Sequence, residues 1–280
     1  MRTFVILFTL FMILGLNSCA PKVYYQVFEA EPVNEDIEKQ ESALIFENAD
    51  CGIYYDFWGE EGDMGFRIEN KTDQALFINL DRSYFVLNGR ANDYFLNRVF
   101  THSSGSSVSG GQTASASRSI SDLDAVGRLL SGSYSVAQSA ALTNSEGYAV
   151  SIPEQEVVCV PAGTLKRIAK FSIYGNKIRD CDLLLYPGRK EVSRLQFDKE
   201  ESPVVFENRL VYHVAEGPDQ QMNHRFYVSE IVNMPKKQLI ESRKEKFCGE
   251  KSMMEKEFFK ETPANKFYIK YEKGSEQWEH

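Results

Sequence analysis

Residues 64–80 read MGFRIENKTDQALFINL, and this stretch decides the fold class. Its first half places Phe66 and Ile68 on one face and charged residues on the other, a period of two that predicts a half-buried β-strand. The polar run Asn70–Asp73 follows, and its short side chains can bond the local backbone in a turn. Ala75–Leu80 then repeats the alternation. Short strands separated by turns are the pattern of an antiparallel β-sandwich.

The same pattern continues on both sides of this stretch. Asn88-Gly89 is a strong signal for a tight hairpin turn. The chain contains 19 Phe and 14 Tyr, and aromatic residues suit a pleated, half-buried surface. The expected strands lie at residues 22–31, 43–46, 53–58, 64–70, 75–80, 83–87, 148–152, 156–160 and 165–173.

Residues 101–150 interrupt the strands and are predicted to be a mobile insertion. More than half of this segment is Ser, Gly and Ala. Its first part, residues 101–121, has almost no large apolar side chain and cannot offset the entropy lost on ordering. Such an insertion can alternatively form a membrane-inserting hairpin, but a solvated loop is the commoner outcome for this composition.

A second strand-rich part follows, with strands expected at residues 182–186, 225–232 and 267–271. Leu239, Ile240, Arg243 and Phe247 have helical spacing, which predicts a surface helix over Lys236–Phe247. The domain organisation expected from these patterns is a leader at 1–18, an N-terminal strand and acidic connector at 19–42, a sandwich at 43–175 and a C-terminal domain at 176–280.

The amino terminus has the three parts of an export signal. Arg2 precedes an apolar run of about 14 residues, which is shorter than the roughly 20 that a membrane-spanning helix needs. The run ends in Leu16-Asn17-Ser18-Cys19, and no other small residue is better placed for cleavage. The sequence therefore predicts a leader that is removed before Cys19.

Leu16-Asn17-Ser18-Cys19 resembles the lipobox of bacterial lipoprotein precursors, although Asn17 is bulkier than the residue usual there. The resemblance implies that Leu16, Asn17 and Ser18 are recognised during processing and that Cys19 carries diacylglycerol and a further acyl chain such as palmitate. Ala20 stands where an Asp often marks retention at the inner membrane. The resemblance therefore implies an outer-membrane protein, anchored by lipid and facing the periplasm.

Two further runs resemble envelope lipoproteins. Phe66–Asp73 together with Pro161-Ala162-Gly163-Thr164 resembles immunoglobulin-like sandwiches of such proteins. Tyr24-Tyr25-Gln26-Val27, with the strands up to Phe100, is similar to a group of uncharacterised lipoproteins of Gram-negative bacteria. The expected fold class is accordingly mainly β: an immunoglobulin-like antiparallel sandwich with an insertion and a C-terminal part that carries one helix.

Charge and cysteine content limit the partners and the covalent links. The chain has a net charge of −8, which repels phosphate backbones and argues against a nucleic-acid partner. In an oxidising compartment, Cys51, Cys159, Cys181 and Cys248 are candidates for up to two disulfides, whose pairing the sequence does not choose. The alternative is that they are buried free thiols that pack as small apolar residues.

The sequence assigns no catalytic residue, no metal ligand and no cofactor. His213 and His224 can approach each other across a hairpin, but partly exposed strand histidines are the simpler interpretation. Asp180-Cys181-Asp182 and residues 60–63 offer carboxylates without the spacing of a calcium loop. No Gly-x-Ser-x-Gly elbow occurs.

The leading functional prediction is a lipid-anchored, non-enzymatic envelope module that is structural or binds a protein. One alternative is a glycan-binding module in which Trp58, Tyr54 and Tyr55 form an aromatic platform, although core packing with a Trp at the end of a strand is the simpler interpretation of these residues. The other alternative is an enzyme whose site the sequence does not reveal.

Overall fold

The computed structural model describes residues 22–105, 147–169 and 171–274, and nearly all of their regular structure is β-strand. All pairings between the strands are antiparallel. The prediction of a mainly β chain is therefore confirmed. The elements are β1 (Val23–Pro32), β2 (Ile37–Lys39), β3 (Leu44–Glu47), β4 (Cys51–Tyr55), β5 (Phe66–Asn70), β6 (Leu76–Asn79), η1 (Leu80–Arg82), β7 (Tyr84–Leu87), β8 (Arg90–Asp93), β9 (Val99–Gly105), β10 (Gly147–Pro153), β11 (Val157–Val160), β12 (Leu165–Ile168), β13 (Ser193–Gln196), β14 (Val205–Val214), β15 (Gln220–Pro235), α3 (Lys236–Leu239), β16 (Ile240–Phe247), β17 (Glu250–Phe259) and β18 (Lys266–Glu272).

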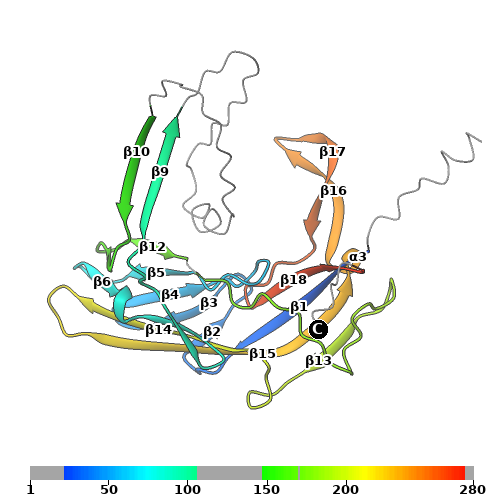
Figure 1. Cartoon of the computed structure of the whole chain (residues 1–280), viewed down its shortest axis with the longest axis horizontal. Coiled ribbons are helices and arrows are strands. Elements are labelled where there is room, and N and C mark those ends of the chain that lie inside the picture. The colour runs from blue at the N-terminus through cyan, green and yellow to red at the C-terminus, as the bar shows by residue number, and fades with distance from the viewer. Residues whose placement is uncertain (1–21, 106–146, 170, 275–280) are drawn as a thin grey trace, which may run out of the picture.

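The largest sheet has nine strands and is built around the long hairpin of β14 and β15 (Figure 1). Its main path is β11-β6-β14-β15-β1-β18, while β13 adds to β15, β7 adds to β14, and β8 adds to β7. The hairpin register runs from Val205 opposite Tyr227 to Tyr212 opposite Gln220. Among the sheets of the described chain, one curls into a half-barrel. The finer immunoglobulin-like arrangement stays a prediction.

The second sheet has five strands in the order β12-β5-β4-β3-β2. Phe66 and Ile68 of β5 are buried while Arg67 is exposed, so the predicted alternation is confirmed. The next strand, β6, lies in the other sheet, and the chain crosses between the sheets at Asn70. The Asn70 side chain fixes this crossing, because its Nδ2 donates to the carbonyls of Gln74 (2.7 Å) and Val160 (2.9 Å).

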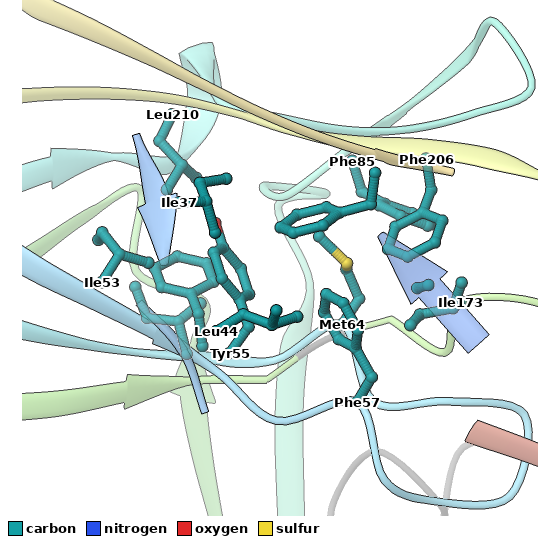
Figure 2. Packing of buried hydrophobic residues seen from close by; sticks show 14 of the residues in the cluster. Ile37, Leu44, Ile53, Tyr55, Phe57, Met64, Phe85, Ile173, Phe206 and Leu210 are labelled. Atoms are coloured by element: carbon teal, nitrogen blue, oxygen red, sulfur yellow. The ribbon is translucent and has the colours of Figure 1, made fainter. Parts of the chain in front are cut away.

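The core lies where the inner faces of these two sheets meet. Figure 2 shows Leu44, Ile53 and Tyr55 from the five-stranded sheet pointing toward Leu210 and Phe206 from the nine-stranded sheet. All five side chains are buried. Aromatic rings fill much of this space, and such rings bury large areas while preferring edge-to-face and offset contacts.

The segments 43–175 and 176–280 share this core. β14, from the second segment, pairs with β6 and β7 from the first, and the same apolar cluster includes residues of both segments. The domain division at 175/176 stays a prediction, and both of its parts contribute to the nine-stranded sheet. The turn predicted at Asn88-Gly89 joins β7 to β8, with φ angles of 46° and 79°, and is confirmed.

Two hairpins project from the sheets, and they leave the same side of the body in the view of Figure 1. One is formed by β9 and β10, and the described residues of the predicted insertion, 101–105 and 147–150, lie in these two strands. Residues 106–146, the rest of that insertion, lie outside the described residues. The other hairpin, β16 with β17, is called the arm below.

The arm corrects the helix predicted over Lys236–Phe247, which is wrong. Only the single turn α3 is helical, and the chain then pairs as a strand with β17. The helical spacing of Leu239, Ile240, Arg243 and Phe247 produced the incorrect prediction, and the Lys, Arg and Glu residues of this run are also good helix formers. Propensity is outweighed here because Cys248 and Gly249 adopt positive φ angles of 50° and 88° and turn the chain back onto itself.

Candidate functional site

The proposed lipid site lies just outside the described residues. Cys19 and the residues Leu16, Asn17 and Ser18 are not described, and the first strand starts at Val23. Val23 and Tyr24 are held between two strands, since Val23 lies opposite Glu272 of β18 and Tyr24 lies opposite Pro235 of β15. The strand predicted at residues 22–31 is therefore confirmed.

A cluster of three tyrosines lies at this end of β1. The ring centroid of Tyr24 is 5.3 Å from that of Tyr186 and 5.7 Å from that of Tyr271. The ammonium groups of Lys177 and Lys273 lie over the rings of Tyr271 and Tyr186, at 5.0 and 5.4 Å. Cations at such distances are attracted to the ring faces. This end of the molecule therefore combines aromatic rings with positive charge.

The arm is fixed to the body beside the same end of β1. Pro235, the partner of Tyr24, directly precedes α3, and α3 leads into β16. The Lys260 ammonium donates to the carbonyls of Lys237 and Gln238 at 2.9 Å each, which ties the end of β17 to α3. The base of the arm is therefore held together by hydrogen bonds between Lys260, which follows β17, and α3, which precedes β16.

Trp58 packs against the base of the arm. Its ring centroid is 5.1 Å from Phe259 at the end of β17 and 5.4 Å from Tyr268 of β18. Tyr25 completes the cluster at 5.5 Å from Tyr268. Burial, with added contributions from Tyr268 and Glu257, raises the pKa of Tyr25 to about 12. The cluster is therefore uncharged at neutral pH and serves as an apolar clamp.

The predicted glycan platform is not assembled in the structure. Trp58 is half-buried in the clamp, and Tyr55 is fully buried in the core. Tyr54 faces elsewhere, since its hydroxyl donates to Glu69 at 2.6 Å and its ring lies under Arg67. The three aromatic side chains thus belong to three different environments.

The outer part of the arm is exposed on both strands. From Glu241 to Glu257, every residue except Ser252 is exposed. Phe247 (79%), Met253 (97%) and Met254 (77%) are the most exposed large apolar side chains among those that the structure describes. A hollow of about 410 Å³ lies against the arm and is lined by Arg243, Lys244, Glu245, Lys246, Lys251 and Phe258.

A buried chain of polar side chains connects the two sheets, and sequence reasoning missed it. The Tyr55 hydroxyl lies 2.7 Å from Nδ1 of His224, and Nδ2 of Asn208 donates to the same hydroxyl at 3.3 Å. The Tyr94 hydroxyl donates to Oδ1 of Asn208 at 2.5 Å. All four residues are buried. Such networks help to specify one arrangement of a core when their members are satisfied.

His224 is the one titratable base in this network. Burial lowers the pKa of His224 to about 4. Its Nε2 has no hydrogen-bond partner among the described residues. The interpretation of His224 as a partly exposed strand histidine is therefore wrong, because it lies on the inner face of β15 between Met222 and Phe226. Alternation along β15 is the signal that could have revealed its burial.

His213 does not approach His224. His213 lies near the carboxyl end of β14, where its Nδ1 is 3.3 Å from Asp219 and its ring stacks on Phe77 at 5.2 Å. Asp219 is shared, because Asn79 donates to the same carboxylate at 3.1 Å and Arg82 pairs with it. Within the described ranges, no three His, Cys, Asp or Glu side chains are grouped as a metal site.

The four cysteines that the structure describes are free thiols. Cys159, Cys181 and Cys248 are exposed, and no two of the described cysteines form a disulfide. Cys51 is buried, its sulfur lies 3.9 Å from that of Met222, and burial raises its pKa to about 12. Cys51 thus packs as a small apolar residue, as the alternative to the disulfides expects.

Comparison with protein-family models, with curated proteins and with solved structures found no match to the chain. Within residues 22–105, 147–169 and 171–274, no helix has the length and apolar character needed to cross a membrane.

Proposed function

We propose that the chain is a lipid-anchored, non-enzymatic protein of the bacterial outer membrane that faces the periplasm and binds another envelope protein. The observation that carries this proposal is Leu16-Asn17-Ser18-Cys19 behind a short apolar leader, four residues before the first strand. A thioether-linked diacylglycerol with an amide-linked acyl chain provides more than the single chain that binds only reversibly. The folded body would then sit close to the bilayer, on a tether of a few residues.

Exposed apolar residues at the base of the β9–β10 hairpin support the protein-binding part of the proposal. Leu96 and Val99 lie at the start of this hairpin, Val157 lies shortly after its end, and all three are exposed. Surface apolar groups that lie near one another mark protein interaction sites. The immunoglobulin-like arrangement expected from the sequence belongs to this proposal, since such sandwiches commonly present binding surfaces at their ends.

The anchor predicts the outcome of Cys19→Ala in the full-length chain. The variant is expected to remain an unprocessed precursor or to be lost from the outer-membrane fraction, because no thiol is present to accept the lipid. Fractionation with mass spectrometry of the amino terminus measures this. Cys181→Ala is the matched control, since Cys181 is an exposed thiol outside the leader sequence. Normal lipid-linked fractionation of Cys19→Ala would overturn the anchor.

The protein-binding part predicts capture of an envelope protein by the lipidated chain after chemical cross-linking in cells. A variant with Leu96→Ser, Val99→Ser and Val157→Ser is expected to reduce the captured amount severalfold, because it removes the exposed apolar contacts. Equal capture by the parent and the variant would reject this surface. Failure of the parent to capture any envelope protein would reject protein binding itself.

A further inference from the structure

The arm lacks the packing that normally stabilises two strands. An isolated two-stranded hairpin is at best marginally stable in water, and it gains stability by packing against another surface. The base of the arm has such packing in the clamp of Trp58, Phe259 and Tyr268. Its outer part has no apolar cover among the described residues, and Figure 1 shows β16 and β17 standing clear of the sheets.

The tip of the arm carries the chemistry of a bilayer interface. Phe247, Met253 and Met254 are exposed there on both sides of the Cys248-Gly249 turn. Lys244, Lys246 and Lys251 flank them and have no ion-pair partner among the residues that the structure describes. Aromatic and apolar side chains bordered by lysines are typical of segments that enter the boundary between headgroups and acyl chains.

Charge is distributed so that this end of the molecule favours an anionic surface. Residues 234–273 contain 11 Lys and Arg against 7 Asp and Glu. Residues 22–105 contain 7 Lys and Arg against 16 Asp and Glu. Lys and Arg beside a membrane are attracted to anionic lipid headgroups. The hollow against the arm is lined by Arg243, Lys244, Lys246 and Lys251 together with Glu245 and Phe258, so its four cationic side chains outnumber its one carboxylate.

The arm begins beside the point where the chain would leave the lipid anchor. Tyr24 pairs with Pro235, next to α3. The four residues from Cys19 to Val23 can extend about 14 Å, and the eight residues of β16 extend roughly 26 Å. An arm lying along the surface would therefore touch the same bilayer as the anchor, at a second point roughly 26 Å away.

We propose that the arm is a second, reversible membrane contact: Phe247, Met253 and Met254 enter the interface of the bilayer, and the lysines beside them bind anionic lipid headgroups. Two contacts would fix the orientation of the sheets on the membrane, which one flexible tether does not. The proposal rests on the proposed lipid anchor only for the choice of membrane and for this orientation.

The test uses the mature chain, residues 19–280, with Cys19→Ser so that no lipid is attached. This chain contains every described strand. Binding is measured by sedimentation with vesicles of phosphatidylethanolamine and phosphatidylglycerol and with vesicles of phosphatidylcholine alone. The parent is expected to bind the anionic vesicles, more weakly at high salt. The variant with Phe247→Ser, Met253→Ser and Met254→Ser is expected to bind at least about tenfold more weakly.

The matched control is Leu165→Ser with Leu184→Ser and Val192→Ser, because these residues are also exposed and apolar but lie on the body. It is expected to bind the vesicles as the parent does. Circular dichroism checks that each variant folds. Absence of binding by the parent, or equal binding by the tip variant, would overturn the proposal. The proposal would also be overturned if the tip variant lost cross-linked protein capture while no vesicle binding was seen. That result would assign the tip to a protein partner.

A second measurement uses the exposed thiol at the tip. An environment-sensitive fluorophore is attached to residues 19–280 with Cys19→Ser, either at Cys248 in a chain with Cys159→Ser and Cys181→Ser or at Cys159 in a chain with Cys181→Ser and Cys248→Ser. Anionic vesicles are expected to shift the emission of the first to the blue and to leave the second unchanged. Equal spectra for the two labels would contradict insertion of the tip. Neither experiment uses a chain with lipid attached at residue 19. Failure of the anchor, which is measured with Cys19→Ala, is therefore distinguished from failure of the arm.

Discussion

Phe226→Ala is expected to lower the free energy of unfolding by about 3–5 kcal/mol, the largest loss we predict for a single substitution. Phe226 is 0% exposed and lies on β15, the strand that pairs with both β14 and β1. Its ring centroid is 5.0 Å from Phe57, 5.4 Å from Tyr55 and 5.4 Å from Phe206. Truncation removes contacts to both sheets at once and leaves a cavity that packed neighbours fill only partly.

Urea-induced unfolding followed by far-ultraviolet circular dichroism measures this loss. Phe247→Ala is the matched control, because it makes the same substitution at an exposed position, where the expected change is within about 0.5 kcal/mol. Since whole domains are stable by about 5–15 kcal/mol, Phe226→Leu is a milder second variant with an expected loss near 1 kcal/mol. Losses below about 1 kcal/mol for Phe226→Ala would mean that the two sheets do not pack around this ring.

Local patterns predicted the parts of the fold that local physics determines. The alternation of Phe66 and Ile68 with Arg67 describes one strand with one buried face, and the structure confirms it. Asn88-Gly89 predicted a turn because both residues tolerate a positive φ angle. These features depend on neighbours within a few residues, so no knowledge of distant contacts was needed.

Pairing between distant segments was beyond that reasoning. The polar run after β5 predicted a turn, but nothing local indicated that Asn70 bonds the carbonyl of Val160, 90 positions away, and sends the next strand into the other sheet. β14 pairs with β15 over a long stretch, and β1 is added to β15. These pairings likewise depend on which side chains become buried when the whole sheet is assembled. Local patterns could therefore predict which segments form strands, but not the order of those strands in the sheets.

The candidate site shows the same division. Cys19 was found from a contiguous motif, and its outcome awaits the anchor experiment. The arm was missed because the spacing of its apolar residues indicated a helix, while the Cys248-Gly249 turn and the clamp at Phe259 favour strands. The polar network around His224 was missed for a different reason, namely that its partners come from β4 and β14, at positions 55 and 208.

His224 makes the stability of the protein depend on pH. Its pKa is lowered by burial to about 4 in the folded chain, against about 6.5 for an exposed histidine. Between these two values the unfolded chain binds a proton that the folded chain does not bind, so stability falls as the pH falls. The contribution is complete above pH 6.5 and is lost on lowering the pH to about 4, and the full loss is about 3 kcal/mol.

The structure gives the physical reason for this cost. A protonated imidazole donates from both nitrogens, but Nε2 has no partner among the described residues and the side chain is 1% exposed. The phenol of Tyr55 offers no compensating charge, because burial raises its pKa and keeps it neutral. Protonation would therefore leave a buried charge without an opposite charge beside it, which is expensive in a low-dielectric core.

The comparison that isolates His224 is between the parent and His224→Gln, since glutamine does not titrate and its amide can still bond the Tyr55 hydroxyl. Unfolding free energies measured by urea titration at half-unit steps from pH 7.5 to 4 are expected to fall more steeply for the parent, by up to about 1.4 kcal/mol per pH unit. Glu29 adds a loss at low pH in both chains. Burial raises its pKa, but the hydrogen bonds and charges of Lys266, Asn265 and Lys39 together outweigh burial and lower the pKa, and the difference between the chains removes this contribution. Parallel pH profiles for the two proteins would show that His224 is solvated in the folded state, and the two sheets would then not close over it as the ring contacts of Phe46 and Tyr55 with His224 require.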